Sequence, residues 1–192
     1  MKILLRNLMQ KVGPISTEII DRLYTSSQVR LFKKSDIIYI ANDESYYSFF
    51  ILSGFAKAIS YVQDKECLMD FIYEGKFIES YRINSKGEKH FPYTLEAIED
   101  TSVLFIPNQL LEDMYSKSLY FTNWARIYAK KELEFIEDYF ITDYFLDAKS
   151  QYSRIIKFRP ELAQRASLKQ LASYLNIAPE SLSRIRNKIA KD

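Results

Sequence analysis

The chain has 192 residues, of which 47% are hydrophobic and 27% are charged, a composition that indicates a globular protein with a buried core. A single cysteine, Cys67, excludes an intramolecular disulfide and a cysteine zinc cluster, and the single histidine, His90, argues against a histidine-rich metal site. The sequence shows no signal peptide and no apolar run of membrane-spanning length, so we expect a cytoplasmic protein without a membrane partner.

The net charge of +2 conceals a division of charge along the chain. Residues 1–148 hold 17 Lys and Arg against 22 Asp and Glu, a net charge of −5. Residues 149–192 hold 10 Lys and Arg against 3 Asp and Glu, a net charge of +7. A basic tail on a mildly acidic body favours a polyanionic partner such as nucleic acid, although a solvated helix face would have the same composition.

The first hundred residues predict two kinds of structure. Residues 3–24 have helical apolar spacing that is interrupted at Gly13-Pro14, and Ser16 is suited to start a second helix. After them, short runs rich in β-branched and aromatic residues alternate with turn residues, which predicts a sandwich, barrel or jelly roll. The predicted strands are residues 29–32, 36–40, 47–52, 55–62, 66–73 and 93–106.

The pattern becomes helical after Pro107, and the absence of Gly and Pro over the following residues predicts one long helix. Phe121, Trp124, Tyr128 and Phe135 recur at steps that place them on one face of that helix. This apolar stripe needs a partner, which is either a second copy of the same helix or the β-domain of the same chain. We expect the stripe to form a homodimer contact, and packing on the β-domain remains the alternative.

The C-terminal 45 residues predict three short helices, the last two in helix-turn-helix spacing. Ser167 and Gln170 form a capping box that starts the first helix of the pair. Asn176 stands where the turn requires a left-handed residue, and Pro179 suits the first turn of the second helix. The apolar positions expected to face the core are Leu171, Ala172, Leu175, Ile177, Leu182, Ile185 and Ile189.

The polar side chains of this helix pair have the chemistry of a major-groove reader. An arginine donates two hydrogen bonds to guanine, a glutamate accepts from the cytosine amino group, and Ser, Asn and Lys reach phosphates. A three-helix bundle with a solvated outer face is the alternative. The candidate DNA-binding residues are Ser167, Lys169, Gln170, Pro179, Glu180, Ser181, Ser183, Arg184, Asn187 and Lys188.

Several segments resemble the Crp/Fnr family of bacterial transcription regulators, namely residues 47–54, 74–78, 160–162 and 177–186. The resemblance implies an α+β fold with a cyclic-nucleotide-binding-like β jelly roll at 1–107 and a long dimerisation helix at 108–146. It also implies a C-terminal three-helix domain with a helix-turn-helix at 147–192, after which no residues remain for a C-terminal wing. The implied partners are a second copy of the chain, double-stranded DNA with a pseudo-palindromic operator, and RNA polymerase, with Glu180 and Arg184 at the base-reading positions.

The resemblance also implies an effector pocket, but its residues depart from those that bind cyclic AMP. Cyclic-AMP-binding relatives have a Gly-Glu pair and then an Arg-Ser pair for the phosphate, whereas this chain has Glu79-Ser80 and Phe91-Pro92. We therefore expect no cyclic AMP and no cofactor. The pocket is expected either to bind an apolar or aromatic ligand or to be filled by its own side chains. The candidate pocket residues are Phe77, Ile78, Glu79, Ser80, Tyr81, Phe91, Pro92 and Tyr93.

The expected function is that of a sequence-specific DNA-binding regulator. The alternative is a small-molecule-binding module whose helical tail docks a protein partner. An enzyme is not expected, because one histidine cannot supply a metal set and no nucleophile–base pair or Gly-rich phosphate loop is visible. A lone cysteine cannot hold an iron–sulfur cluster, and haem binding by His90 or Cys67 is less expected than ordinary surface and core roles.

Overall fold

The computed structural model describes residues 1–40, 46–62, 65–79, 93–140 and 145–190. It opens with two helices, α1 (Lys2–Val12) and α2 (Thr17–Thr25), in agreement with the predicted break at Gly13-Pro14. The Ser16 hydroxyl accepts a hydrogen bond from the Ile19 N–H at 3.3 Å, which satisfies one of the free donors at the start of α2.

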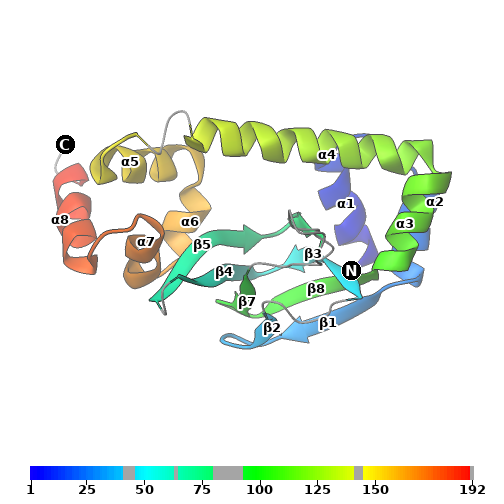
Figure 1. Ribbon diagram of the computed structural model, residues 1–192, viewed down its shortest axis with the longest axis horizontal. Coiled ribbons are helices and arrows are strands. Elements are labelled where there is room, and N and C mark those ends of the chain that lie inside the picture. The colour runs from blue at the N-terminus through cyan, green and yellow to red at the C-terminus, as the bar shows by residue number, and fades with distance from the viewer. Residues whose placement is uncertain (41–45, 63–64, 80–92, 141–144, 191–192) are drawn as a thin grey trace.

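The strands form two four-stranded antiparallel sheets with the orders β1-β8-β3-β6 and β2-β7-β4-β5 (Figure 1). Their inner faces meet in one apolar core that includes Phe49 and Phe105 of the first sheet and Ile72 and Leu95 of the second. Each predicted strand run is confirmed, although the last divides into two strands and β6 was not predicted. The bounds are β1 (Gln28–Phe32), β2 (Ile37–Tyr39), β3 (Tyr47–Ser53), β4 (Phe55–Val62), β5 (Lys65–Tyr73), β6 (Phe77–Ile78), β7 (Thr94–Ala97) and β8 (Thr101–Pro107).

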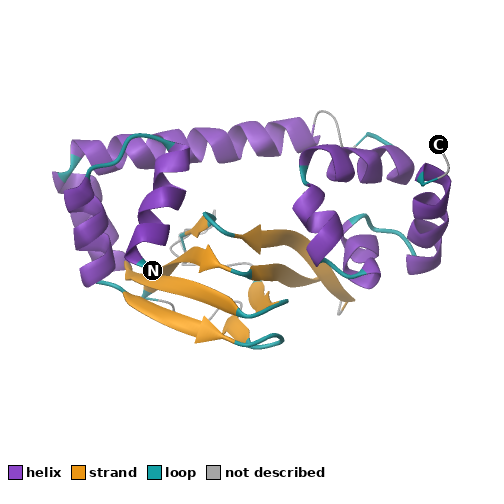
Figure 2. Ribbon diagram, turned by 180° about the vertical axis from the view of Figure 1, so that it is seen from behind, coloured by secondary structure: helices purple, strands orange, loops and turns teal. Residues whose placement is uncertain are grey.

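The helical segment after Pro107 is two helices, so the prediction of one long helix over 108–146 is wrong. It consists of α3 (Asn108–Lys117) and α4 (Leu119–Asp138). Ser118 breaks the helix with extended backbone angles, and its hydroxyl accepts from the Phe121 N–H at 3.3 Å as the cap of α4. With 20 residues, α4 is about 30 Å long. It runs past the sheets to the C-terminal helices (Figures 1 and 2).

The first half of α4 packs on the N-terminal helices and on the first sheet. Phe121 and Trp124 are each 1% exposed in this core, and the indole N–H of Trp124 donates to the Met9 carbonyl at 2.8 Å. This corrects the prediction that Phe121 and Trp124 contact a second copy, because neither side chain reaches the surface. Their stripe follows the alternative, packing within the same chain.

Four helices rather than the predicted three follow, namely α5 (Ala148–Phe158), α6 (Pro160–Arg165), α7 (Leu168–Tyr174) and α8 (Pro179–Ile189). Arg159 leaves the helical region, and Pro160 then starts α6 in the first turn, where its missing N–H costs nothing. Phe55 and Phe71 of β4 and β5 share a core with Leu162, Leu171 and Leu182 of these helices. The division into three domains therefore stays a prediction, since this core joins strands to C-terminal helices.

Candidate nucleic-acid interface

The turn between α7 and α8 has the local structure that its residues predict. The Ser167 hydroxyl accepts from the Gln170 N–H at 3.2 Å, and the Gln170 side chain accepts from the Ser167 N–H at 2.8 Å, which completes the capping box. Asn176 has a φ of +53°, in the left-handed region, and Pro179 begins α8. These three sequence predictions are confirmed.

The buried faces of the two helices fix which side chains of α8 face outward. Leu171, Ala172 and Leu182 are fully buried, and Ile185 and Ile189 pack against the same core. Glu180, Arg184, Asn187 and Lys188 lie on the opposite side of α8 and are exposed. Because α8 is at the end of the molecule farthest from the sheets, this face is open to a large partner (Figure 1).

The remaining candidate DNA-binding residues surround this face. Ser167 and Lys169 are exposed, whereas Gln170 is half-buried and its side-chain oxygen is engaged in the capping box. Pro179, Ser181 and Ser183 on α8 are half-buried. Sequence reasoning omitted Arg186, which is exposed on α8 and adds a further cation to that helix.

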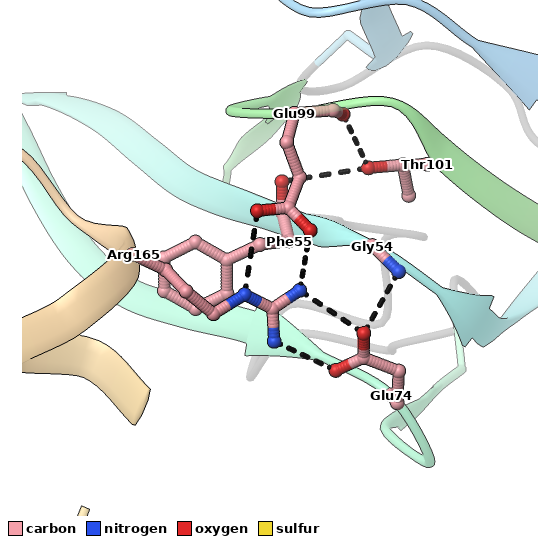
Figure 3. A network of polar contacts seen from close by, with 6 residues as sticks. All are labelled: Gly54, Phe55, Glu74, Glu99, Thr101 and Arg165. Atoms are coloured by element: carbon pink, nitrogen blue, oxygen red, sulfur yellow. Dashed lines mark hydrogen bonds and ion pairs between the residues drawn. The ribbon is translucent and has the colours of Figure 1, made fainter. Parts of the chain in front are cut away.

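Arg165, the last residue of α6, joins the C-terminal helices to the β-domain through two carboxylates (Figure 3). Its guanidinium donates to both oxygens of Glu74 at 2.9 and 3.0 Å, and to Glu99 at 2.6 and 3.3 Å. The same guanidinium lies 4.6 Å from the ring centre of Phe55, a cation–π distance. Glu74 in turn accepts from the Gly54 N–H at 2.9 Å, so the turn after β3 also belongs to this junction.

The charges at the junction are stabilised by one another. Burial opposes ionisation of Glu74, but hydrogen bonds from Arg165 and from backbone N–H groups hold its pKa below the ordinary value. Hydrogen bonding to Glu74 raises the pKa of Arg165, although burial acts in the opposite direction. Both groups are therefore ionised at neutral pH, and protonation of Glu74 would weaken the junction.

A second polar contact lies beside the first. Arg159 donates to Asp70 of β5 at 3.4 Å and to the Tyr174 hydroxyl of α7 at 3.2 Å. The ring centres of Tyr174 and Phe71 are 5.3 Å apart, and burial raises the pKa of Tyr174 to about 12, so its phenol is neutral at ordinary pH. Sequence reasoning missed both junction contacts because each pairs residues far apart in the chain, without any local spacing to reveal them.

The described effector-pocket candidates lie in more than one place. The Phe77 N–H donates to the Tyr128 hydroxyl at 2.8 Å, and that hydroxyl donates to the Phe77 carbonyl at 3.1 Å. Ile78 is buried. Glu79 is exposed, and its carboxylate accepts a hydrogen bond from the Tyr115 hydroxyl. Tyr93 instead packs against the core between the sheets.

The other effector candidates, Ser80, Tyr81, Phe91 and Pro92, lie outside the described residues, as does His90. Cys67 is half-buried on β5, and the described residues contain no group of three or more His, Cys, Asp and Glu side chains that could hold a metal ion. No helix in the described part of the chain is long and apolar enough to cross a membrane.

Comparison with known proteins places the fold. The cyclic nucleotide-binding domain family matches residues 29–118. No curated protein sequence matches the chain. The structure is similar to that of the c-di-GMP-responsive global regulator CLP of Xanthomonas campestris, with a TM-score of 0.69 and 16% identity over 92% of this chain and 93% of that one.

Two further solved structures support the same architecture. FixK2 from Bradyrhizobium japonicum has a TM-score of 0.66 and 21% identity, over 86% of this chain and 85% of that one. The Thermus thermophilus catabolite activator protein has a TM-score of 0.53 and 16% identity, over 92% and 84%. Residues 29–118 thus carry the β-fold of a cyclic nucleotide-binding domain, followed by helices arranged as in these regulators.

Proposed function

We propose that the chain is a cytoplasmic, sequence-specific DNA-binding transcription regulator of the Crp/Fnr type, which binds a pseudo-palindromic operator as a homodimer. The observation that carries the proposal is the exposed polar face of α8, presented by a buried helix pair at the end of the molecule. The structural likeness to named regulators supports it through the fold. RNA polymerase is the expected further partner of such a regulator.

The base-reading roles are assigned to the centre of this face. Glu180 and Arg184 are one helical turn apart, and the Nε of Arg184 lies 3.4 Å from the Glu180 carbonyl oxygen, to which it donates. An arginine so placed reads guanine through its terminal nitrogens, and a glutamate accepts from cytosine. Ser167 and Lys169 on α7 are suited to phosphates, which position the helix without reading sequence.

The dimer contact is assigned to the exposed face of α4, and not to the face with Phe121 and Trp124 that the sequence predicts. The exposed positions of α4 and its end recur at alternating steps of three and four, the repeat of a coiled-coil seam. The exposed fractions of the apolar members are 83% for Leu119, 55% for Leu133, 47% for Ile136 and 57% for Phe140. The dimer seam defined in this way consists of Leu119, Thr122, Arg126, Ala129, Leu133, Ile136 and Phe140.

Two such helices paired side by side would set the distance between the two α8 helices. A dimer of this kind reads half-sites centred roughly 34 Å apart, one turn of DNA. An effector could change DNA affinity only by favouring one of two arrangements of the helices. Because Glu79-Ser80 and Phe91-Pro92 lack the groups that hold a cyclic phosphate, we propose that cyclic AMP is not that effector.

The test is the change Arg184→Ala, measured on an operator obtained by selection from genomic fragments. We expect a loss of about 1–3 kcal/mol on the operator and relaxed preference at one base position. The matched control is Lys34→Ala, an exposed cation in the turn after β1 and outside the C-terminal helices, which should leave affinity unchanged. An equal loss on operator and random DNA would show that Arg184 contacts only phosphate and would contradict its base-reading role.

A further inference from the structure

A cavity of about 340 Å³ lies where α4 ends, between that helix, α5 and α7. Its volume is at the lower end of the range for small-molecule sites, roughly 300–1,000 Å³. The described candidates for the effector pocket, such as Phe77 and Ile78, are not among its described lining residues. Those lining residues are Phe135, Asp138, Tyr139, Gln151, Arg154, Ile155, Phe158, Arg159, Tyr174 and Leu175.

The walls of this cavity, which we call the hinge cavity, contain both aromatic rings and cationic side chains. Phe135, Tyr139, Phe158 and Tyr174 supply four rings. The Arg159 guanidinium lies 4.8 Å from the ring centre of Phe135, so it borders the aromatic part of the cavity directly. Such a combination of ring faces with a fixed cation favours a ligand that is both planar and negatively charged.

The charge in the walls is not balanced. Arg154 is paired with Asp138 at 2.7 Å, which accounts for one of the two cations and for the carboxylate among the lining residues. The side chain of Arg159 is only 12% exposed, and it pairs at 3.4 Å with the carboxylate of Asp70, which is not among the described lining residues. The described lining residues therefore include two cations and one carboxylate, and Arg159 is the cation whose carboxylate partner lies outside that set.

Arg159 is also short of hydrogen bonds. Its Nε is buried and has no hydrogen-bond partner among the described residues. A buried guanidinium with an unused donor is costly, and an added anion that strengthens its pairing recovers part of that cost. Its hydrogen bonds to Asp70 and to Tyr174 are each longer than 3 Å.

We propose that the hinge cavity binds a small aromatic monocarboxylate, with its ring among the aromatic side chains and its carboxylate on Arg159. The cavity walls come from α4 and from Tyr174 of α7, the helix next to α8, so a ligand would bridge the dimer helix and the DNA-binding helices. Its effect on DNA affinity rests on the proposed function, whereas its binding does not.

The experiment titrates the full-length protein with 1-naphthoate by calorimetry, beside the neutral alcohol 1-naphthylmethanol and inorganic phosphate. We expect one saturable site for 1-naphthoate, with affinity about tenfold or more above that of the alcohol, since a charge-assisted hydrogen bond is lost in the neutral analogue. Inorganic phosphate, which has no ring, should neither bind nor compete. Equal binding of the alcohol would overturn the role of the carboxylate. Competition by phosphate would overturn the requirement for an aromatic ring in the ligand.

Two variants locate the site. Arg159→Gln should reduce the affinity for 1-naphthoate to that of the alcohol. The control Lys130→Gln, which changes an exposed cation of α4 outside the dimer seam and the cavity lining, should not change it. Because Arg159 also contacts Asp70, Gln151→Trp supplies a second test that fills the cavity without removing a charge. The proposal is overturned if the wild type shows no saturable binding, or if Gln151→Trp binds 1-naphthoate as tightly as the wild type.

DNA affinity is measured separately, with and without 1-naphthoate. If 1-naphthoate binds but leaves DNA affinity unchanged, the coupling between the cavity and DNA binding is overturned, whereas the ligand site itself is supported. Loss of the site with retained DNA binding leaves the proposed function intact. Ligand binding by a protein without any DNA affinity would contradict the proposed function alone.

Discussion

At the residue scale, the sequence could predict one left-handed turn residue and two helix caps. Asn176 was expected in the left-handed region because a turn between two helices needs such a residue and asparagine tolerates it. Ser16 and Ser167 were expected as helix caps because their hydroxyls can accept from the N–H three residues later. These predictions rest on neighbours in the chain, and therefore needed no knowledge of the fold.

Gly54 and Gly75 both have backbone angles that favour glycine, but they differ in the room available for a Cβ atom. Both have positive φ, at +99° and +88°, but a Cβ on Gly54 would lie 2.5 Å from the Thr101 hydroxyl and 2.6 Å from the Asp100 carbonyl. At Gly75 the nearest atom is a methyl of Leu8 at 3.7 Å.

We expect Gly75→Ala to lower the free energy of unfolding by about 1 kcal/mol, from the backbone angle alone. Gly54→Ala should lower it by about 3 kcal/mol or more, because β3 and β8 must also separate. Urea unfolding of the two variants measures the difference. Equal losses would show that the contact with Thr101 and Asp100 adds nothing.

At the element scale, the long-range pairs determine how α6 and α7 sit on β4 and β5. Arg165 reaches Glu74 and Glu99 from 91 and 66 residues away, and no spacing in the sequence points to either partner. The break at Ser118 was also missed, because Ser is compatible with a helix and only its capping bond ends one here. Prediction of these features required the fold itself.

The pKa of Glu74 gives the junction a pH dependence. A carboxylate whose pKa is lowered by folding contributes stability above its unfolded value, near 4.3, and loses it as pH falls through the folded value. Glu74→Gln should therefore cost about 1 kcal/mol at neutral pH and progressively less as the pH falls below about 4. Urea unfolding at several pH values, with the exposed Glu137→Gln as control, measures this convergence; a constant difference would contradict it.

The dimer seam on α4 makes a prediction about association. Leu133→Glu places a charge at the middle of the seam, so we expect the dimer to dissociate at least about tenfold more readily, measured by light scattering after gel filtration. Ile3→Glu, which changes an exposed apolar residue on α1, is the matched control and should not alter association. A wild-type protein that is monomeric at all concentrations would contradict the assignment of the seam as a dimer contact.

At the scale of the whole molecule, the order of the elements was more predictable than their packing. Alternation, turn residues and caps indicated a β-domain, then helices, then a helix pair, and the comparison with known folds agrees. The same periodicity could not say which partner covers a helix stripe, which is why Phe121 and Trp124 were assigned to a second copy. The exposed seam at Leu133 and Ile136 has equally regular spacing, and only the packing of Trp124 distinguishes the two faces.

In the proposed homodimer, α8 reads a DNA sequence together with the α8 of the second copy. The most direct measurement is selection of genomic fragments by the purified full-length protein at physiological salt, read by sequencing. We expect enrichment of a palindrome with half-sites roughly 34 Å apart along the duplex. Uniform weak binding that disappears as salt is raised, with no enriched sequence, would contradict it and leave only a basic surface.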